Sequence, residues 1–199
     1  RLRLVIEATS DGVWDWNPES GSMFFSDRWY TLLGYAPNEF PASREAWRER
    51  IHPDDLAAFD AAIATHLAGH SAELDLRYRM RTRDGAWKWI NSRGRLIERD
   101  AAGQPRRLLG TSVDITDRQQ AEEALRTSEA FYRSIFDSSL YGIGVIGANL
   151  ELQQVNAAFC KMMGYTSQQL LGRLAIGDIT QPDDWPASRA AFRRLIGGV

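Results

Sequence analysis

The sequence has little cysteine, little net charge and no long apolar run, and each shortage excludes a class of protein. A single cysteine, Cys160, excludes an internal disulfide framework and a zinc site built from several cysteines. A formal net charge of -2 predicts no nucleic-acid partner and no contact with an anionic membrane. No apolar run reaches the ~18 residues of a membrane span, and no leader precedes the first helical pattern. We therefore expect a cytoplasmic region, which a membrane tether elsewhere in the full-length protein would not contradict.

Motifs of common catalytic sites are also missing. The sequence has no nucleophile beside a base, no glycine-rich phosphate loop and no cluster of metal ligands. Asp54-Asp55 and Asp183-Asp184 each follow a proline, where stabilisation by the helix dipole explains adjacent acids better than paired-carboxylate chemistry. The sequence therefore predicts a regulatory region and not an enzyme. Because it opens inside a helical pattern without methionine, we expect a piece of a longer protein.

What the sequence does contain is an internal repeat. Gly34-Tyr35 recurs as Gly164-Tyr165, at an offset of 164 − 34 = 130. The motif HPDD at 52–55 recurs as QPDD at 181–184, at an offset of 129. At the offset of 130, glycines, helix caps and apolar residues recur in four further pairs: Gly12 and Gly142, Ser26 and Asn156, Trp29 and Phe159, Phe40 and Leu170. The chain therefore holds one complete copy and about the first half of a second.

The complete copy has the pattern of an α+β domain. Residues 74–81 alternate strictly between apolar and polar side chains, and the turn Asp84-Gly85 follows, so a hairpin is predicted here. The other expected strands are 12–17, 22–26, 86–99 and 106–116, and the expected helices are 27–34, 43–51 and 53–69. Together these predict an antiparallel five-stranded sheet with short helices on one face and a groove between sheet and helices.

In this order, the stretches GVWDWN, LLGY, IHPDD, DGAWKWINSRG, GQPRRLLGTSVDIT and RQQAEEAL resemble a PAS domain with its C-terminal PAC motif. The second copy resembles the first part of another PAS domain. The resemblance implies a PAS domain at 1–117, a linker helix at 118–134 and a partial second PAS domain at 135–199. It also implies a bacterial sensory or dimerising module upstream of an output domain, commonly a histidine kinase, a diguanylate cyclase or a cyclic-di-GMP phosphodiesterase.

The linker helix follows the last expected strand without a loop. Thr116 and Gln119 have the spacing of a capping box, which predicts that the helix begins at once. Asp114 matches the acid of the family's DIT motif, which ties the end of the sheet to this helix. Steps of four and three residues mark an apolar seam at Ala121, Leu125, Ser128, Tyr132 and Ile135. We expect Asp114, Thr116 and Leu125 to relay a signal, and the helix and PAS surfaces to form a homodimer. A helix packed on its own domain is the alternative.

Candidate ligand contacts lie in the expected groove. Trp29, Leu33, Phe40 and Trp47 are expected to line it, although packing of a ligand-free core is the favoured interpretation. His66 falls near the apolar face of the long helix and is a haem-ligand candidate, whereas partial exposure near the helix end is more typical of a lone histidine.

Cofactor chemistry is not decided by the sequence. A flavin-cysteine photosensor is not expected, because the family's Asn-Cys pair is absent and Cys160 is best explained as a small buried thiol. Flavin and haem both stay open, but a protein without any cofactor is favoured over either. Two functions follow: a module that senses a small-molecule or redox cue, or a ligand-free module for dimerisation and interaction.

Overall fold

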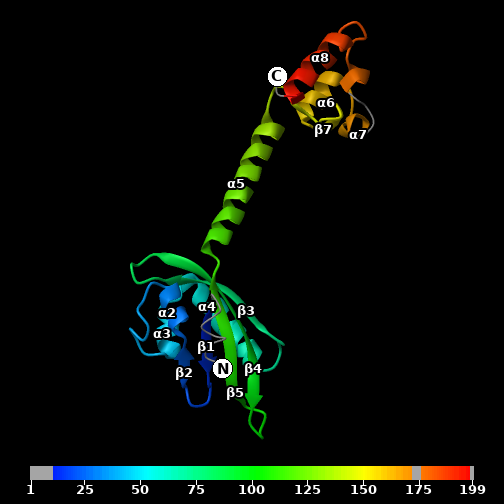
Figure 1. The fold of residues 1–199 in the computed structure, drawn as a ribbon. Helices are drawn as coiled ribbons and strands as arrows, with labels where there is room; N and C mark the ends of the chain where they lie inside the picture. Colours follow the sequence, from blue (N-terminus) through cyan, green and yellow to red (C-terminus); the bar gives the residue numbers. More distant parts are fainter. Residues whose placement is uncertain (1–10, 172–175, 198–199) are drawn as a thin grey trace. The chain divides into compact units, whose positions relative to one another are not determined.

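The structure is a computed structural model that describes residues 11–171 and 176–197 (Figure 1). Contacts between residues divide the chain into two compact units, with the division after Glu122. Each unit is described by itself below.

The first unit is built on one five-stranded antiparallel sheet. Its strands are β1 (Gly12–Trp16), β2 (Met23–Phe25), β3 (Leu74–Arg81), β4 (Trp87–Arg99) and β5 (Pro105–Asp114). They lie in the order β2-β1-β5-β4-β3. Three helices connect β2 to β3: α2 (Asp27–Leu32), α3 (Arg44–Arg48) and α4 (Pro53–Leu67). The predicted fold class is confirmed, and the last strand of the domain is the central strand of its sheet.

Alternation of side chains decides which face of the sheet meets the helices. Along β3, Leu74, Tyr78 and Met80 are buried, while Arg77 and Arg81 are exposed. The buried residues of the strands join those of the helices in a single apolar core. His52 begins α4 as predicted, because its Nδ1 accepts a hydrogen bond from the Asp54 N–H at 3.2 Å.

The second unit repeats the start of this fold. After α5 (Thr116–Ser138) come β6 (Gly144–Ile146) and β7 (Leu152–Val155), which pair in an antiparallel hairpin. The helices α6 (Ala157–Met163), α7 (Ser167–Leu170) and α8 (Trp185–Gly197) follow, with a 3-10 helix (Ile176–Ile179) before α8. The described residues of this unit form a two-stranded sheet, and they include no strands that correspond to β3, β4 and β5.

A matching pair of hydrogen bonds shows that the repeat is structural. The Ser26 hydroxyl accepts from the Val13 N–H at 2.9 Å, and the Asn156 Oδ1 accepts from the Ile143 N–H at 2.9 Å. Both pairs are related by the offset of 130. Ser26 does not cap α2 with its side chain, as the sequence led us to expect, because its hydroxyl is engaged by β1. Asn156 does both, since its Oδ1 also accepts from the Phe159 N–H at 2.8 Å.

Candidate functional site

The four expected groove residues lie together in the core of the first unit. Trp29, Leu33 and Trp47 are each 2% exposed, and Phe40 is half-buried. Trp29 stacks on Phe25 with ring centroids 3.8 Å apart, and its ring meets those of Phe40 and Trp47 at 6.1 and 6.2 Å. These side chains belong to one packed cluster, and their role as pocket lining stays a prediction.

Trp14 occupies the middle of the same face of the sheet. The register pairs Trp14 with Gly110 on β5 and Gly110 with Gly94 on β4. A Cβ atom on either glycine would overlap the Trp14 ring, so both positions must lack a side chain for the ring to lie across the sheet. Trp14 is 1% exposed and reaches Trp47 on α3 at 5.3 Å between ring centroids. The ring therefore joins the sheet to the helices and fills the space between them.

Four buried polar side chains of this core are linked by hydrogen bonds. The Trp47 Nε1 donates to the Tyr78 hydroxyl at 2.9 Å, which is 2.7 Å from the Ser92 hydroxyl, itself 2.7 Å from that of Ser112. Burial raises the pKa of Tyr78, an effect that outweighs the opposing hydrogen bonds, so the phenol stays neutral. This chain of bonds fixes α3 on β3, β4 and β5 without a ligand.

His66 is buried, and the expectation of partial exposure was wrong. It is 2% exposed because it follows Ile63 by one helical turn on the buried stripe of α4. Its Nδ1 lies 2.9 Å from the Ser71 hydroxyl, and its Nε2 has no hydrogen-bond partner within the described ranges.

A free imidazole nitrogen suits an axial haem ligand. However, Phe59, Ile63 and Tyr78 fill the space between α4 and the sheet, each at most 4% exposed. A porphyrin would have to displace them. The role of His66 as a haem ligand therefore stays a prediction, and it requires that displacement.

The junction between β5 and α5 is held by side chains of the sheet's end. The Asp114 Oδ1 accepts from the Thr116 N–H at 2.9 Å and from its hydroxyl at 2.6 Å. The Thr116 hydroxyl in turn accepts from the Trp89 N–H on β4 at 3.0 Å. Thr116 does not form the expected capping box with Gln119, because α5 already begins at Thr116 and the Gln119 N–H donates to the Ile115 carbonyl at 2.9 Å. The first turn of α5 is thus bonded to two strands.

Asp114 is a charged group at the end of the core. Its Oδ2 lies 2.9 Å from the Lys88 Nζ. Burial raises the pKa of Asp114, but hydrogen bonds from Thr116 and Lys88 outweigh burial and hold that pKa below its usual range. The carboxylate is therefore ionised at neutral pH and accepts hydrogen bonds from both sides.

Leu125 lies on α5 with 61% of its surface exposed. Tyr132 and Ile135, further along the predicted seam, are 48% and 51% exposed. Phe131 is 67% exposed and was missed from the sequence, because it lies one position off the seam. These exposed apolar side chains lie along α5, and pairing of this helix with a second copy stays a prediction.

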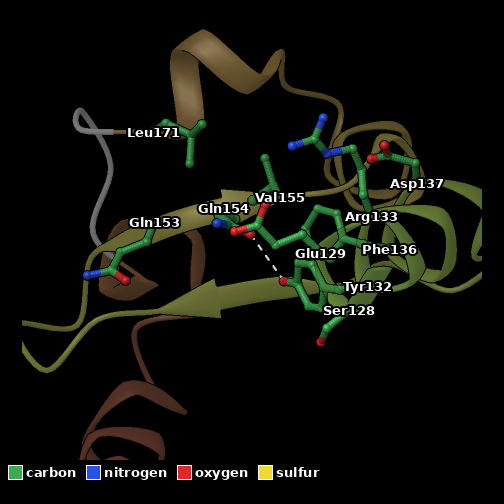
Figure 2. Close-up of a pocket in the computed structure, with 10 residues that line it drawn as sticks. All are labelled: Ser128, Glu129, Tyr132, Arg133, Phe136, Asp137, Gln153, Gln154, Val155 and Leu171. Atoms are coloured by element: carbon green, nitrogen blue, oxygen red, sulfur yellow. Dashed lines mark hydrogen bonds between the residues drawn. The ribbon is translucent and has the colours of Figure 1, made fainter. Parts of the chain in front are cut away.

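A pocket of about 780 Å³ lies inside the second unit (Figure 2). It is bounded by the C-terminal half of α5 and by β7, and Tyr132 donates to Gln154 Oε1 at 3.1 Å across it. Tyr132 also stacks on Phe136 at 5.5 Å. The sequence offered no sign of this pocket, because it depends on how α5 packs on β7.

Cys160 is half-buried on α6 as a free thiol, and the expected full burial was wrong.

Other kinds of site were sought in the part of the chain that the structure describes. There, no group of three or more histidine, cysteine, aspartate or glutamate side chains is placed to hold a metal ion. Across 11–171 and 176–197, no helix combines the length and apolar character needed to cross a membrane.

Comparison with known families decides the identity of both copies. A family model described as "PAS fold" matches residues 22–112, and one described as "PAS domain" matches residues 130–196. The chain belongs to the PAS family. It is a tandem PAS region, since the second match covers the copy that the repeat predicted. The boundaries 1–117, 118–134 and 135–199 stay predictions.

Relatives of this tandem PAS region are larger proteins. The sensor protein FixL of Bradyrhizobium diazoefficiens is 31% identical over 92% of this chain, which spans 35% of that relative. The two-component sensor PprA of Pseudomonas aeruginosa is 31% identical over 99% of this chain, which spans 21% of it. A probable diguanylate cyclase, DgcE of Escherichia coli, is 26% identical over 94% of this chain, which spans 17% of that relative.

A solved structure supports the same assignment. The sensory box histidine kinase/response regulator of Burkholderia thailandensis is 41% identical, with a TM-score of 0.58 over 67% of this chain and 98% of that one. This PAS region is therefore related to the sensory modules of signalling proteins that carry an output domain.

Proposed function

We propose that this chain is the sensory and signal-relay region of a larger bacterial signalling protein. It couples a small-molecule or redox cue to a C-terminal output domain, either a histidine kinase or a cyclic-di-GMP cyclase or phosphodiesterase. Its relatives support this proposal, because two are named sensors and one a probable diguanylate cyclase. In this proposal the region is regulatory, is located in the cytoplasm and performs no catalysis itself.

One observation carries the proposal: α5 leaves the sheet from its central strand with one residue, Ile115, between them. Asp114 and Thr116 bond this junction to β4, and the Ile115 N–H donates to the Trp89 carbonyl at 2.9 Å. Because no slack separates strand from helix, a shift of β5 reorients α5. The exposed Leu125 seam pairs with the same helix of a second chain, so the movement reaches the output domains of a homodimer.

A second candidate is a ligand-free module for dimerisation and interaction. The filled core of the first unit favours it, because Trp14 and its aromatic neighbours occupy the groove. In the second copy the offset of 130 places Gly144 and Cys160 at the positions of Trp14 and Tyr30. We therefore propose that the first copy relays the signal and that any ligand binds in the second.

An absorption spectrum of the purified protein separates the two candidates. A Soret band identifies haem, and visible flavin bands identify flavin. If the protein is colourless, native mass spectrometry distinguishes a bound metabolite from no ligand. A ligand that binds to a variant truncated after the first copy would contradict the division of roles.

The relay is tested with Leu125→Glu in the full-length protein. A charge in the seam destabilises helix pairing, so we expect a monomer by light scattering and an output that ignores its stimulus. Ala124→Glu adds the same charge at an exposed position off the seam and should preserve both properties. If Leu125→Glu matches wild type in both measurements, α5 is only a tether.

A further inference from the structure

Lys88 bridges a helix of the aromatic core to the signalling junction. It lies on β4 with the same side-chain parity as Ile90, which is 1% exposed, so its stem points to the helix-covered face. Its Nζ donates to the Leu32 carbonyl at 3.0 Å and lies 2.9 Å from the Asp114 Oδ2. One ammonium group therefore bonds the end of α2 and the end of β5.

Each side of this bridge leads to a different part of the domain. Leu32 is the last residue of α2, which presents Trp29 and Tyr30 to the core at 2% and 1% exposure. Asp114 holds Thr116, the first residue of α5, through its other carboxylate oxygen. Side chains and hydrogen bonds thus connect the aromatic core to α5 along α2, β4 and the junction.

We propose that Lys88 is a positioning residue that couples the position of α2 to the first turn of α5. An ammonium group suits this task, because it has three donors and can serve a helix-end carbonyl and a carboxylate together. The carbonyls at a helix C-terminus carry partial negative charge, which favours a cation there. A change in core packing that moves α2 therefore alters the Lys88–Asp114 contact and the hold on Thr116.

This role is distinct from a contribution to stability. The side chains of Lys88 and Asp114 are 38% and 31% exposed, and an ion pair with that access to water contributes little to folding. Loss of the ammonium should leave the sheet and the aromatic core in place while disconnecting α2 from α5. Coupling and stability are therefore measured separately.

The test asks whether a change made in α2 alters the first turn of α5, and it uses the 199-residue chain. Trp29→Phe keeps an aromatic ring but alters the packing of α2. Backbone amide NMR shifts of Asp117 to Gln119 report α5. We expect Trp29→Phe to move these signals in the wild-type background and to leave them unmoved in Lys88→Met, which keeps an unbranched stem without donors. Lys88→Arg restores a cation with donors and should restore the response.

Arg83→Met is the matched control. Arg83 lines the same surface pocket as Lys88, but its side chain pairs with Glu39 at 2.9 Å. Its removal should leave the response of α5 to Trp29→Phe intact. Asp114→Asn breaks the next link of the bridge and takes the place of Lys88→Met if that variant does not fold.

The proposal is overturned if the α5 amides respond to Trp29→Phe as strongly in a folded Lys88→Met variant as in wild type. It is also overturned if Arg83→Met removes the response equally. The inference rests on the proposed relay, yet the two fail separately. Leu125→Glu without effect in the full-length protein refutes the relay through α5, whereas an unchanged NMR response in Lys88→Met refutes only the bridge.

Discussion

Replacement of Trp14 by alanine tests whether the groove of the first copy is filled by the protein itself. Trp14 is 1% exposed, lies against Gly94 and Gly110, and meets Trp47 at 5.3 Å between ring centroids. Large-to-small changes of a buried tryptophan cost about 3–5 kcal/mol, because transfer energy is lost and a cavity is left. We expect a loss near the upper end, since neighbouring glycines have no side chain with which to fill the space.

The assay is urea unfolding followed by tryptophan fluorescence. Six of the seven tryptophans lie in the first copy, so the signal reports that unit. Trp87→Ala is the control, because Trp87 is 41% exposed and its ring contacts only His52 among the aromatic contacts described. We expect it to cost less than ~1.5 kcal/mol, as surface changes with few contacts do.

Indole then tests the shape of the cavity. If Trp14→Ala leaves a space of the ring's shape, indole should bind there and stabilise the variant by about 2.7 kcal/mol at 100 times its dissociation constant. Wild type should gain nothing. A cost below about 1 kcal/mol for Trp14→Ala, together with no stabilisation by indole, would show that the ring does not fill the groove.

Three further outcomes are expected. Thr116→Ala removes the acceptor of the Trp89 N–H and should cost about 1–3 kcal/mol, whereas Thr116→Ser should retain most of that stability in the same urea assay. Hydrogen bonds from Arg79 lower the pKa of Asp55 in the folded protein, although burial opposes them. The stabilisation that ionised Asp55 contributes is therefore complete above the pKa of Asp55 in the unfolded chain, and it is lost as pH falls through the pKa in the folded protein. Asp55→Asn should therefore flatten the loss of stability measured below about pH 4. Residues 135–199 alone should show no cooperative thermal transition, and a sharp one would contradict this.

Interactions between residues close in the sequence were predicted well. Alternation along residues 74–81 identified the buried face of β3, since side-chain direction in a strand depends only on position. His52-Pro53 placed the start of α4, because a helix cap is a local structure. The repeat identified a second copy, which matching hydrogen bonds of Ser26 and Asn156 then confirmed.

Interactions between distant residues depended on register and were missed or misassigned. Thr116 carries a capping-box pattern, but its hydroxyl accepts from Trp89, 27 residues earlier in the chain. Lys88 shows no local sign of its bond to Leu32, which is 56 residues away. His66 was expected to be partly exposed, and only the packing of α4 on the sheet buries it.

By itself, the sequence determined the order of strands and helices, the tandem repeat and the direct passage from β5 to α5. These features follow from patterns of adjacent residues, which the chain carries whether or not it is folded. Only the tertiary structure decided that Trp14 lies across Gly94 and Gly110, because three separate strands must pair in one register to bring them together. The same pairing placed Lys88 between α2 and Asp114, and so connected the core to the helix that leaves it.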